Sequence, residues 1–151
     1  MRYTLVFTII ILAFAACKKD KYTTAPQIKY VSLSHNAVDL SPTSAVPVIT
    51  INITDAEGDV GITSKDTAFI YMKNLLTNTF DSLPFPNLQS ATKTNFKADV
   101  AITISKVLKC KSQPGFPLHT DVLFFEIYVK DFAKNKSNVI TTTEPVYFTC
   151  R

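Results

Sequence analysis

Apolar and polar residues alternate along much of this 151-residue chain. In the segment AVPVITINIT, isoleucine stands at positions 49, 51 and 53, and polar residues fill the positions between them. A period of two predicts a β-strand that buries one face. Comparable runs recur between proline-, asparagine- and serine-rich segments. We therefore predict strands within residues 27–34, 45–54, 67–76, 96–110, 121–131 and 143–150.

The spacing of these segments predicts the fold class. The run DVLFFEIYVKD is apolar on both faces, as expected for a central strand of a sandwich. Residues 81–95 and 111–121 contain most of the prolines between strands and are predicted to be irregular. Six or seven short strands without a helical period predict an all-β, antiparallel sandwich with immunoglobulin-like topology; a small barrel is the alternative. The chain has no tryptophan, so it lacks the Cys…Trp…Cys pattern of antibody domains.

The first residues do not follow the period-two pattern. Arg2 precedes an almost unbroken apolar run from Leu5 to Ala16, which is too short to span a bilayer and is typical of a secretory signal. The segment FAAC that ends at Cys17 resembles the lipobox of bacterial lipoproteins. The resemblance implies a signal peptide at 1–16, a lipidated Cys17 that anchors the chain in a membrane, and a flexible tether at 17–26. Residues 27–151 then form one domain.

Lys18 follows Cys17, which by the same resemblance implies sorting to the outer membrane or cell surface of a Gram-negative bacterium. A plain secreted protein cut after Ala16 is the alternative. In such an oxidising compartment, Cys110 and Cys150 form an even pair that predicts a disulfide worth about 4 kcal/mol at most. Two free buried thiols are the alternative.

The segment ITDAEGDVG concentrates charge at the end of a predicted strand. Asp55, Glu57 and Asp59 are spaced two apart, so on an extended segment their carboxylates project to one side. Their repulsion would raise their pKa values unless a cation offset it. Ca²⁺ suits such a group because it accepts six to eight oxygen ligands in flexible geometry. The alternative is a solvated turn in which acidic side chains cap backbone amides.

Other acidic residues extend this candidate calcium site. Asp66 follows a little further along, and Asp131, with Asn135, ends the strand predicted at 121–131 and could lie beside the loop. The spacing of the first four carboxylates imitates an EF-hand. However, Val60 stands where the EF-hand loop requires glycine, and a strand precedes the loop in place of a helix.

Two short motifs resemble one class of protein. ITINITDAEGDVG resembles the D-x-D-G-D-[IL]-G loop of small, mostly uncharacterised bacterial surface lipoproteins with a sandwich domain, with Glu57 and Val60 as departures. YVKDFAKNKSNVITT resembles the D-x-A-G-N-x-S-N strand and turn of bacterial immunoglobulin-like domains, with Lys134 where glycine is common. The resemblance implies the same fold and a surface location.

Composition and the remaining residues narrow the function. The chain carries 16 basic and 12 acidic residues, and the basic ones are dispersed, so nucleic-acid binding has little support. His35 and His119 show no triad-like pattern, and we predict no catalysis. We predict a binding or scaffolding module, with a protein or glycan partner at the loops around Phe85 and Phe116. The alternative is that both phenylalanines cap the core. A glycan- or peptide-binding lipoprotein of an uptake system is the second functional hypothesis.

Overall fold

The computed structural model describes residues 22–39, 41, 43–63, 65–87, 94–111 and 117–150. All helical or extended elements that the structure describes in these ranges are β-strands, which confirms the all-β prediction. The strands are β1 (Gln27–Leu33), β2 (Ala37–Val38), β3 (Val48–Asp55), β4 (Phe69–Asn74), β5 (Phe80–Pro84), β6 (Phe96–Thr103), β7 (His119–Leu123), β8 (Phe125–Lys130), β9 (Ile140–Thr141) and β10 (Val146–Cys150). The predicted signal peptide, Cys17 and Phe116 lie outside the described residues.

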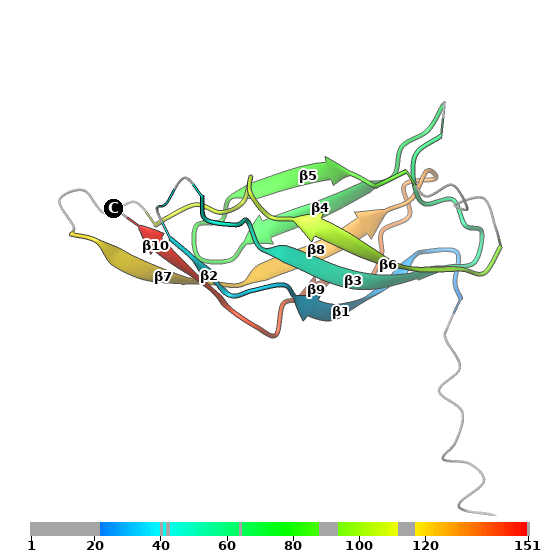
Figure 1. The fold of residues 1–151 in the computed structure, drawn as a ribbon. Helices are drawn as coiled ribbons and strands as arrows, with labels where there is room; N and C mark the ends of the chain where they lie inside the picture. The colour runs from blue at the N-terminus through cyan, green and yellow to red at the C-terminus, as the bar shows by residue number, and fades with distance from the viewer. Residues whose placement is uncertain are drawn as a thin grey trace, which may run out of the picture.

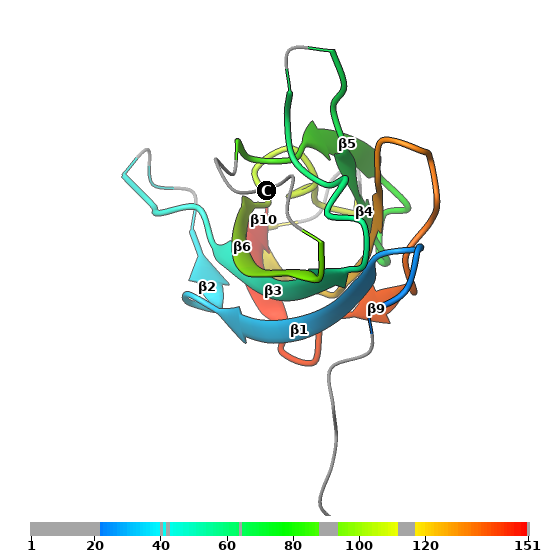
Figure 2. The ribbon, with the colours of Figure 1, turned by 90° about the vertical axis from the view of Figure 1, so that its right-hand side faces the viewer.

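The strands form three sheets (Figure 1). Their orders are β1-β3-β6, β5-β4-β8-β9 and β2-β10-β7. The pairs are antiparallel except for β2 and β10, which run parallel. In Figure 1 the β2-β10-β7 sheet lies at the left-hand end of the molecule. Figure 2 shows β1, β3 and β6 curving around one side and β4 and β5 on the other, an arrangement consistent with a β-sandwich.

The core between the sheets follows the period-two pattern. Ile49, Ile51 and Ile53 of β3 are completely buried, as their alternation predicts. Burying one such side chain contributes about 1.5–3 kcal/mol. The neighbouring strands complete the core with Ile28, Ala68, Ile70, Met72, Val100, Ile102, Leu123, Phe125, Ile127 and Val129.

The segment predicted as one central strand is divided at Phe124. β7 pairs with β10, whereas β8 pairs with β4 and β9, so the chain passes from one sheet to another at this residue. Only one face of this segment is buried, although the sequence is apolar on both faces. Val122 is 46% exposed and Tyr128 is half-buried, because their side of the sheet faces away from the core.

Three strands were not predicted. β2 and β9 have two residues each and depend on their partners, so no periodic pattern marks them. β5 falls in the proline-rich segment 81–95 that we predicted to be irregular. It is an edge strand that pairs only with β4 and ends at Pro84, where a missing N–H costs no ladder bond on the open side.

The chain before β1 already contacts the domain. The N–H of Ala56 donates to the carbonyl of Thr23 (3.2 Å), and Pro26 is buried. The segment that leads to β1 is therefore attached at the end of the sandwich where β3 ends. Among the described residues there is no helix long and apolar enough to cross a membrane.

Candidate functional site

The acidic loop begins with a buried carboxylate. Asp55 is the last residue of β3 and is completely buried. Its Oδ2 accepts hydrogen bonds from the N–H groups of Gly58 (2.6 Å) and Asp59 (3.1 Å). Gly58 has a φ of 70°, a left-handed conformation that glycine adopts without a Cβ clash. The loop is thus folded back over the side chain of Asp55.

A second turn closes over this loop. The N–H of Phe132 donates to the carbonyl of Asp59 (3.0 Å). Asp131, also completely buried, accepts from the backbone N–H (2.7 Å) and the Nδ2 (2.9 Å) of Asn135. Lys134 has a φ of 70°, so it takes the left-handed conformation in the place where the related motif has glycine. The motif at 131–138 therefore forms a tight turn without that glycine.

Burial and charge perturb this cluster. Burial raises the pKa of Asp55 from 3.8 to about 6, the Gly58 and Asp59 N–H groups oppose this, and the charge of Asp59 adds to it. Burial likewise raises the pKa of Asp59, and the charge of Asp131 contributes. Asp55 Oδ1 and Asp59 Oδ1 are buried and have no hydrogen-bond partner among the described residues. Each of these two carboxylates is therefore only partly compensated by the protein.

The structure brings together most of the predicted metal ligands. One carboxylate oxygen each from Asp55, Glu57 and Asp59 lies within 4.8 Å of the other two, and Glu57 is the exposed member. The charge of Asp131 lies close enough to raise the pKa of Asp59. Asp66 is not in this group, because it belongs to the next turn, where its N–H donates to Thr63 Oγ1 (2.9 Å) and its carbonyl accepts from the Thr63 N–H (2.8 Å).

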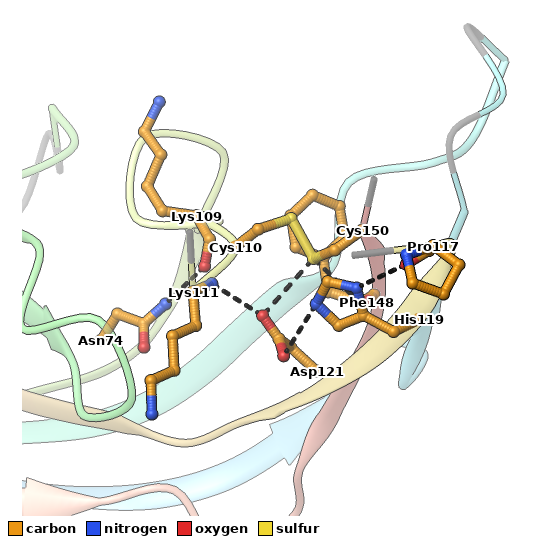
Figure 3. Close-up of polar contacts among 9 residues, drawn as sticks. All are labelled: Asn74, Lys109, Cys110, Lys111, Pro117, His119, Asp121, Phe148 and Cys150. Atoms are coloured by element: carbon orange, nitrogen blue, oxygen red, sulfur yellow. Dashed lines mark hydrogen bonds and ion pairs between the residues drawn. A yellow bond between two sulfur atoms is a disulfide. The ribbon is translucent and has the colours of Figure 1, made fainter. Parts of the chain in front are cut away.

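The second polar cluster surrounds a disulfide (Figure 3). It lies at the end of the molecule where Figure 1 shows β7 and β10. Cys110 and Cys150 are bonded, with their Cα atoms 5.8 Å apart, as predicted. Asp121 Oδ2 accepts from the Lys111 N–H (2.8 Å) and lies 3.5 Å from Cys150 Sγ. A disulfide sulfur carries no proton, so the last distance is a contact and not a hydrogen bond. Neither sulfur is a thiolate, so this group offers no thiolate ligand to a metal.

His119 completes the disulfide cluster. Its Nε2 lies 3.5 Å from Asp121 Oδ1, and its Nδ1 lies 3.1 Å from the carbonyl of Pro117. The other histidine of the chain, His35, has its Nδ1 3.0 Å from Ser34 Oγ and its Nε2 3.0 Å from the carbonyl of Ala45. Ser34 Oγ also accepts from the Val48 N–H (2.9 Å). The third group in this arrangement is the carbonyl of Ala45 and not the carboxylate that a catalytic triad has. The contacts of Ser34 and His35 instead hold the chain between β1 and β3 in place.

A row of aromatic rings on the outer face of the β5-β4-β8-β9 sheet was not predicted. Tyr71 and Tyr128 stack with their ring centroids 4.7 Å apart and an interplanar angle of 8°. Phe80 stacks on the other side of Tyr71 at 5.9 Å, and Phe69 lies 6.4 Å from the same ring. Phe80 is 52% exposed. We call these four residues the aromatic row. The alternation in FIYMK and FEIYVK, which puts aromatics on the polar face, was the available signal.

Two lysines lie against this row. Lys130 Nζ is 5.4 Å from the ring centroid of Tyr71, and Lys136 Nζ is 4.2 Å from that of Tyr128. Both distances are typical of cation–π contacts. Phe85, in contrast, is completely buried, so of the two alternatives for this residue the core position is confirmed.

Comparison with protein-family models, curated proteins and solved structures finds no match to this chain.

Removing the disulfide should destabilise the domain strongly. The bond joins residues separated by 40 positions, so Cys110→Ala/Cys150→Ala is expected to lower the free energy of unfolding by about 3–4 kcal/mol. Urea unfolding monitored by circular dichroism measures this change. The double variant should be insensitive to reductant, whereas the wild-type midpoint should fall when reductant is added. A wild-type midpoint that ignores reductant during complete unfolding and refolding would contradict the prediction.

The acidic loop should make stability depend on pH in the presence of a chelator. The folded-state pKa of Asp55 lies above the unfolded value of 3.8, so the folded state binds more protons between about pH 4 and 6, and stability falls as pH rises through this range. Asp55→Asn keeps an oxygen for the Gly58 and Asp59 N–H groups and removes the charge. The variant should therefore gain stability relative to wild type as pH rises from about 4 to 7, measured by urea unfolding. A constant difference across the range would contradict the prediction.

Proposed function

We propose that the protein is a lipid-anchored, non-catalytic binding module on the outer membrane or cell surface of a Gram-negative bacterium. The observation that carries this proposal is the aromatic row on an open sheet face. Phe69 and Tyr71 come from β4, Phe80 from β5 and Tyr128 from β8, so three strands hold the rings in fixed register. Tyrosine and phenylalanine are enriched at protein interfaces because they bury large areas at little entropic cost.

The charge around the row favours an acidic protein surface as the partner. Lys73, Lys130 and Lys136 border the rings, and Glu126 is the acidic residue on the neighbouring part of β8. A cationic border steers an acidic surface into register with the aromatic centre. The face is also accessible from outside the sandwich, because the opposite side of the same strands, with Ile70 and Ile127, fills the core.

The topology supports an immunoglobulin-like sandwich. One sheet has the order β1-β3-β6, and in the other sheet β4 pairs with β8, with β5 and β9 outside them. These orders correspond to the A-B-E and C-F-G groups of that fold. The short strand β2, which follows β1 in the chain, pairs in parallel with the last strand, β10, in the third sheet.

The disulfide and the N-terminal sequence support the cell envelope. A disulfide persists in oxidising compartments outside the cytoplasm. The FAAC segment places Cys17 directly after the apolar run, and the described domain begins a few residues later. Several acyl chains on Cys17 would provide a stable anchor, because each buried methylene adds about 0.8 kcal/mol.

The anchor is tested by Cys17→Ser. Expressed in a Gram-negative host, the wild-type protein should incorporate labelled palmitate and sediment with membranes. The variant should lose the label and either appear in the soluble envelope fraction or keep its uncleaved signal. Cys110→Ser is the matched control, since it removes a cysteine but leaves the anchor. A variant that is still acylated and membrane-bound would overturn the lipoprotein proposal.

The binding face is tested by photo-crosslinking on intact cells. A photoreactive phenylalanine analogue in place of Phe80 should form a protein adduct, and the same analogue in place of Val31, which is 47% exposed on β1, should not. Adding Lys130→Glu and Lys136→Glu should abolish the adduct, because the charge of the border is reversed, whereas Lys65→Glu should leave it unchanged. Equal adducts from both positions, or loss with Lys65→Glu, would contradict the proposed face. A polysaccharide adduct would overturn the protein partner in favour of glycan binding.

A further inference from the structure

The acidic loop contains two buried carboxylate oxygens without a donor. Asp55 is completely buried, and its Oδ1 has no hydrogen-bond partner among the described residues; the same is true of Asp59 Oδ1. The N–H groups of Gly58 and Asp59 both serve the other oxygen of Asp55. A buried carboxylate oxygen without a donor is costly, and in native structures it commonly indicates a bound ion or water.

We propose that this loop binds one Ca²⁺, with Asp55 Oδ1 and Asp59 Oδ1 as the inner carboxylate ligands and Glu57 as the ligand on the solvent side. The site does not depend on the proposed anchor or on the aromatic row, so the calcium proposal is tested independently of the proposed function.

The spacing of the oxygens fits a calcium ion. Two oxygens that bind the same Ca²⁺ at 2.3–2.6 Å lie at most about 5 Å apart. One oxygen from each of Asp55, Glu57 and Asp59 meets that limit, since all three lie within 4.8 Å of one another. The three carboxylates supply hard oxygen ligands without a histidine or thiolate among them, which disfavours zinc.

The loop also suits calcium better than magnesium. Mg²⁺ requires near-ideal octahedral geometry at 2.0–2.1 Å and retains several waters, whereas Ca²⁺ accepts irregular sets of carboxylate, carbonyl and water oxygens. The ligands come from five consecutive residues of a turn, of which Glu57 is exposed and can adjust. Gly58 in the left-handed conformation and Gly61, with a φ of 122°, give the turn the backbone freedom to present carbonyl oxygens.

The turn at 131–135 positions the inner ligands from outside. Asp131 has both carboxylate oxygens occupied by Asn135, through its N–H and its Nδ2. Its charge lies beside Asp59, and the neighbouring Phe132 N–H holds the carbonyl of Asp59. We therefore assign Asp131 as a positioning residue and not as an inner ligand. Asp66 is assigned no role, because it lies in a separate turn.

The ion would join several segments at one end of the domain. Ala56, between the two inner ligands, accepts from the Asn95 N–H (2.8 Å) and donates to the carbonyl of Thr23 (3.2 Å). The carbonyl of Asp59 accepts a hydrogen bond from the Phe132 N–H (3.0 Å). Fixing residues 55–59 around a cation thus stiffens the contacts of the segment before β1, of the segment before β6 and of the turn after β8.

The test is calcium titration of the full-length protein in detergent. After chelation, isothermal titration calorimetry with Ca²⁺ should give one site per chain, and the Tm should rise by several degrees at saturating Ca²⁺. Mg²⁺ at the same concentration should give a much smaller shift. No heat and no change in Tm with millimolar Ca²⁺, or an equal shift with Mg²⁺, would overturn the proposal.

Four variants assign the ligands. Asp55→Asn and Asp59→Asn should each abolish the calcium-dependent rise in Tm, whereas Asp66→Asn, the matched control, should retain the full rise. Asp131→Asn should weaken the affinity about 10- to 100-fold and keep a stoichiometry of one, as expected for a residue that positions ligands. Equal losses from Asp66→Asn and Asp55→Asn would overturn the assignment.

One further measurement distinguishes a calcium-ligand role of Asp55 from a purely structural role. With chelator at neutral pH, Asp55→Asn should be at least as stable as wild type, because it removes the buried one of two neighbouring carboxylate charges. With Ca²⁺ the order should reverse, because only the wild type binds the ion. If the variant fails to fold, the calorimetry and Tm of the wild type alone still decide whether Ca²⁺ binds. A variant less stable than wild type to the same extent in both conditions would contradict a ligand role.

Discussion

The register of β3 is the constraint on which the acidic end of the molecule depends. Ile49, Ile51 and Ile53 face the core, and a slip of one residue would turn all three outward. Asp55 has the same parity, so the packing of the isoleucines also places its carboxylate in the core. The chain then folds back at Gly58 to bring N–H groups onto that carboxylate. The crowding of charge in this loop is therefore a consequence of strand register and not a property of the turn alone.

The same constraint acts on the segment from β7 to β8. Leu123, Phe125, Ile127 and Val129 are buried, and the positions that continue the alternation at the two ends are Asp121 and Asp131. The alternating buried positions that run through β7 and β8 thus begin and end with a buried aspartate. Asp121 lies against the disulfide and accepts a hydrogen bond from the Lys111 N–H. Asp131 accepts hydrogen bonds from Asn135, and its charge raises the pKa of Asp59. The two polar clusters lie at opposite ends because β7 and β8, which follow one another through Phe124, run between them.

The period-two pattern was sufficient to predict the core strands, and the even number of cysteines left after Cys17 was sufficient to predict the pairing of Cys110 with Cys150. The pattern was not sufficient for β2 and β9, whose two residues become strands only through their partners. β5 was missed because its sequence, FDSLP, faces solvent along an open edge and has little apolar alternation. The strand at 67–76 was predicted, but the aromatic row on its outer face could be recognised only with the neighbouring strands that bring Tyr128 and Phe80 onto Tyr71.

The acidic loop shows which part of a site a sequence contains. The types and spacing of Asp55, Glu57 and Asp59 were enough to predict convergence, and the parity of Asp55 with the isoleucines would have predicted its burial. The separation of Asp66 from the group could not be read from spacing, because it depends on the turn that Thr63 forms with Asp66. The positioning role of Asp131 could not be read from spacing either, because it depends on the hydrogen bonds that Asn135 donates to both of its carboxylate oxygens.

The two ends of the domain differ in how they are held, and this difference bears on where the protein works. The disulfide end is closed covalently and needs only an oxidising compartment. The acidic end leaves two buried carboxylate oxygens without a hydrogen-bond partner among the described residues, and these are the oxygens that the proposed cation would bind. Calcium sites of extracellular modules bind in the 10⁻⁴–10⁻³ M range, which requires calcium levels found outside the cytoplasm. The proposed calcium site would thus suit the same compartment as the disulfide, through independent chemistry. The segment that leads from the predicted anchor contacts the acidic end through Thr23, so a bound ion would stiffen the domain where it meets its tether.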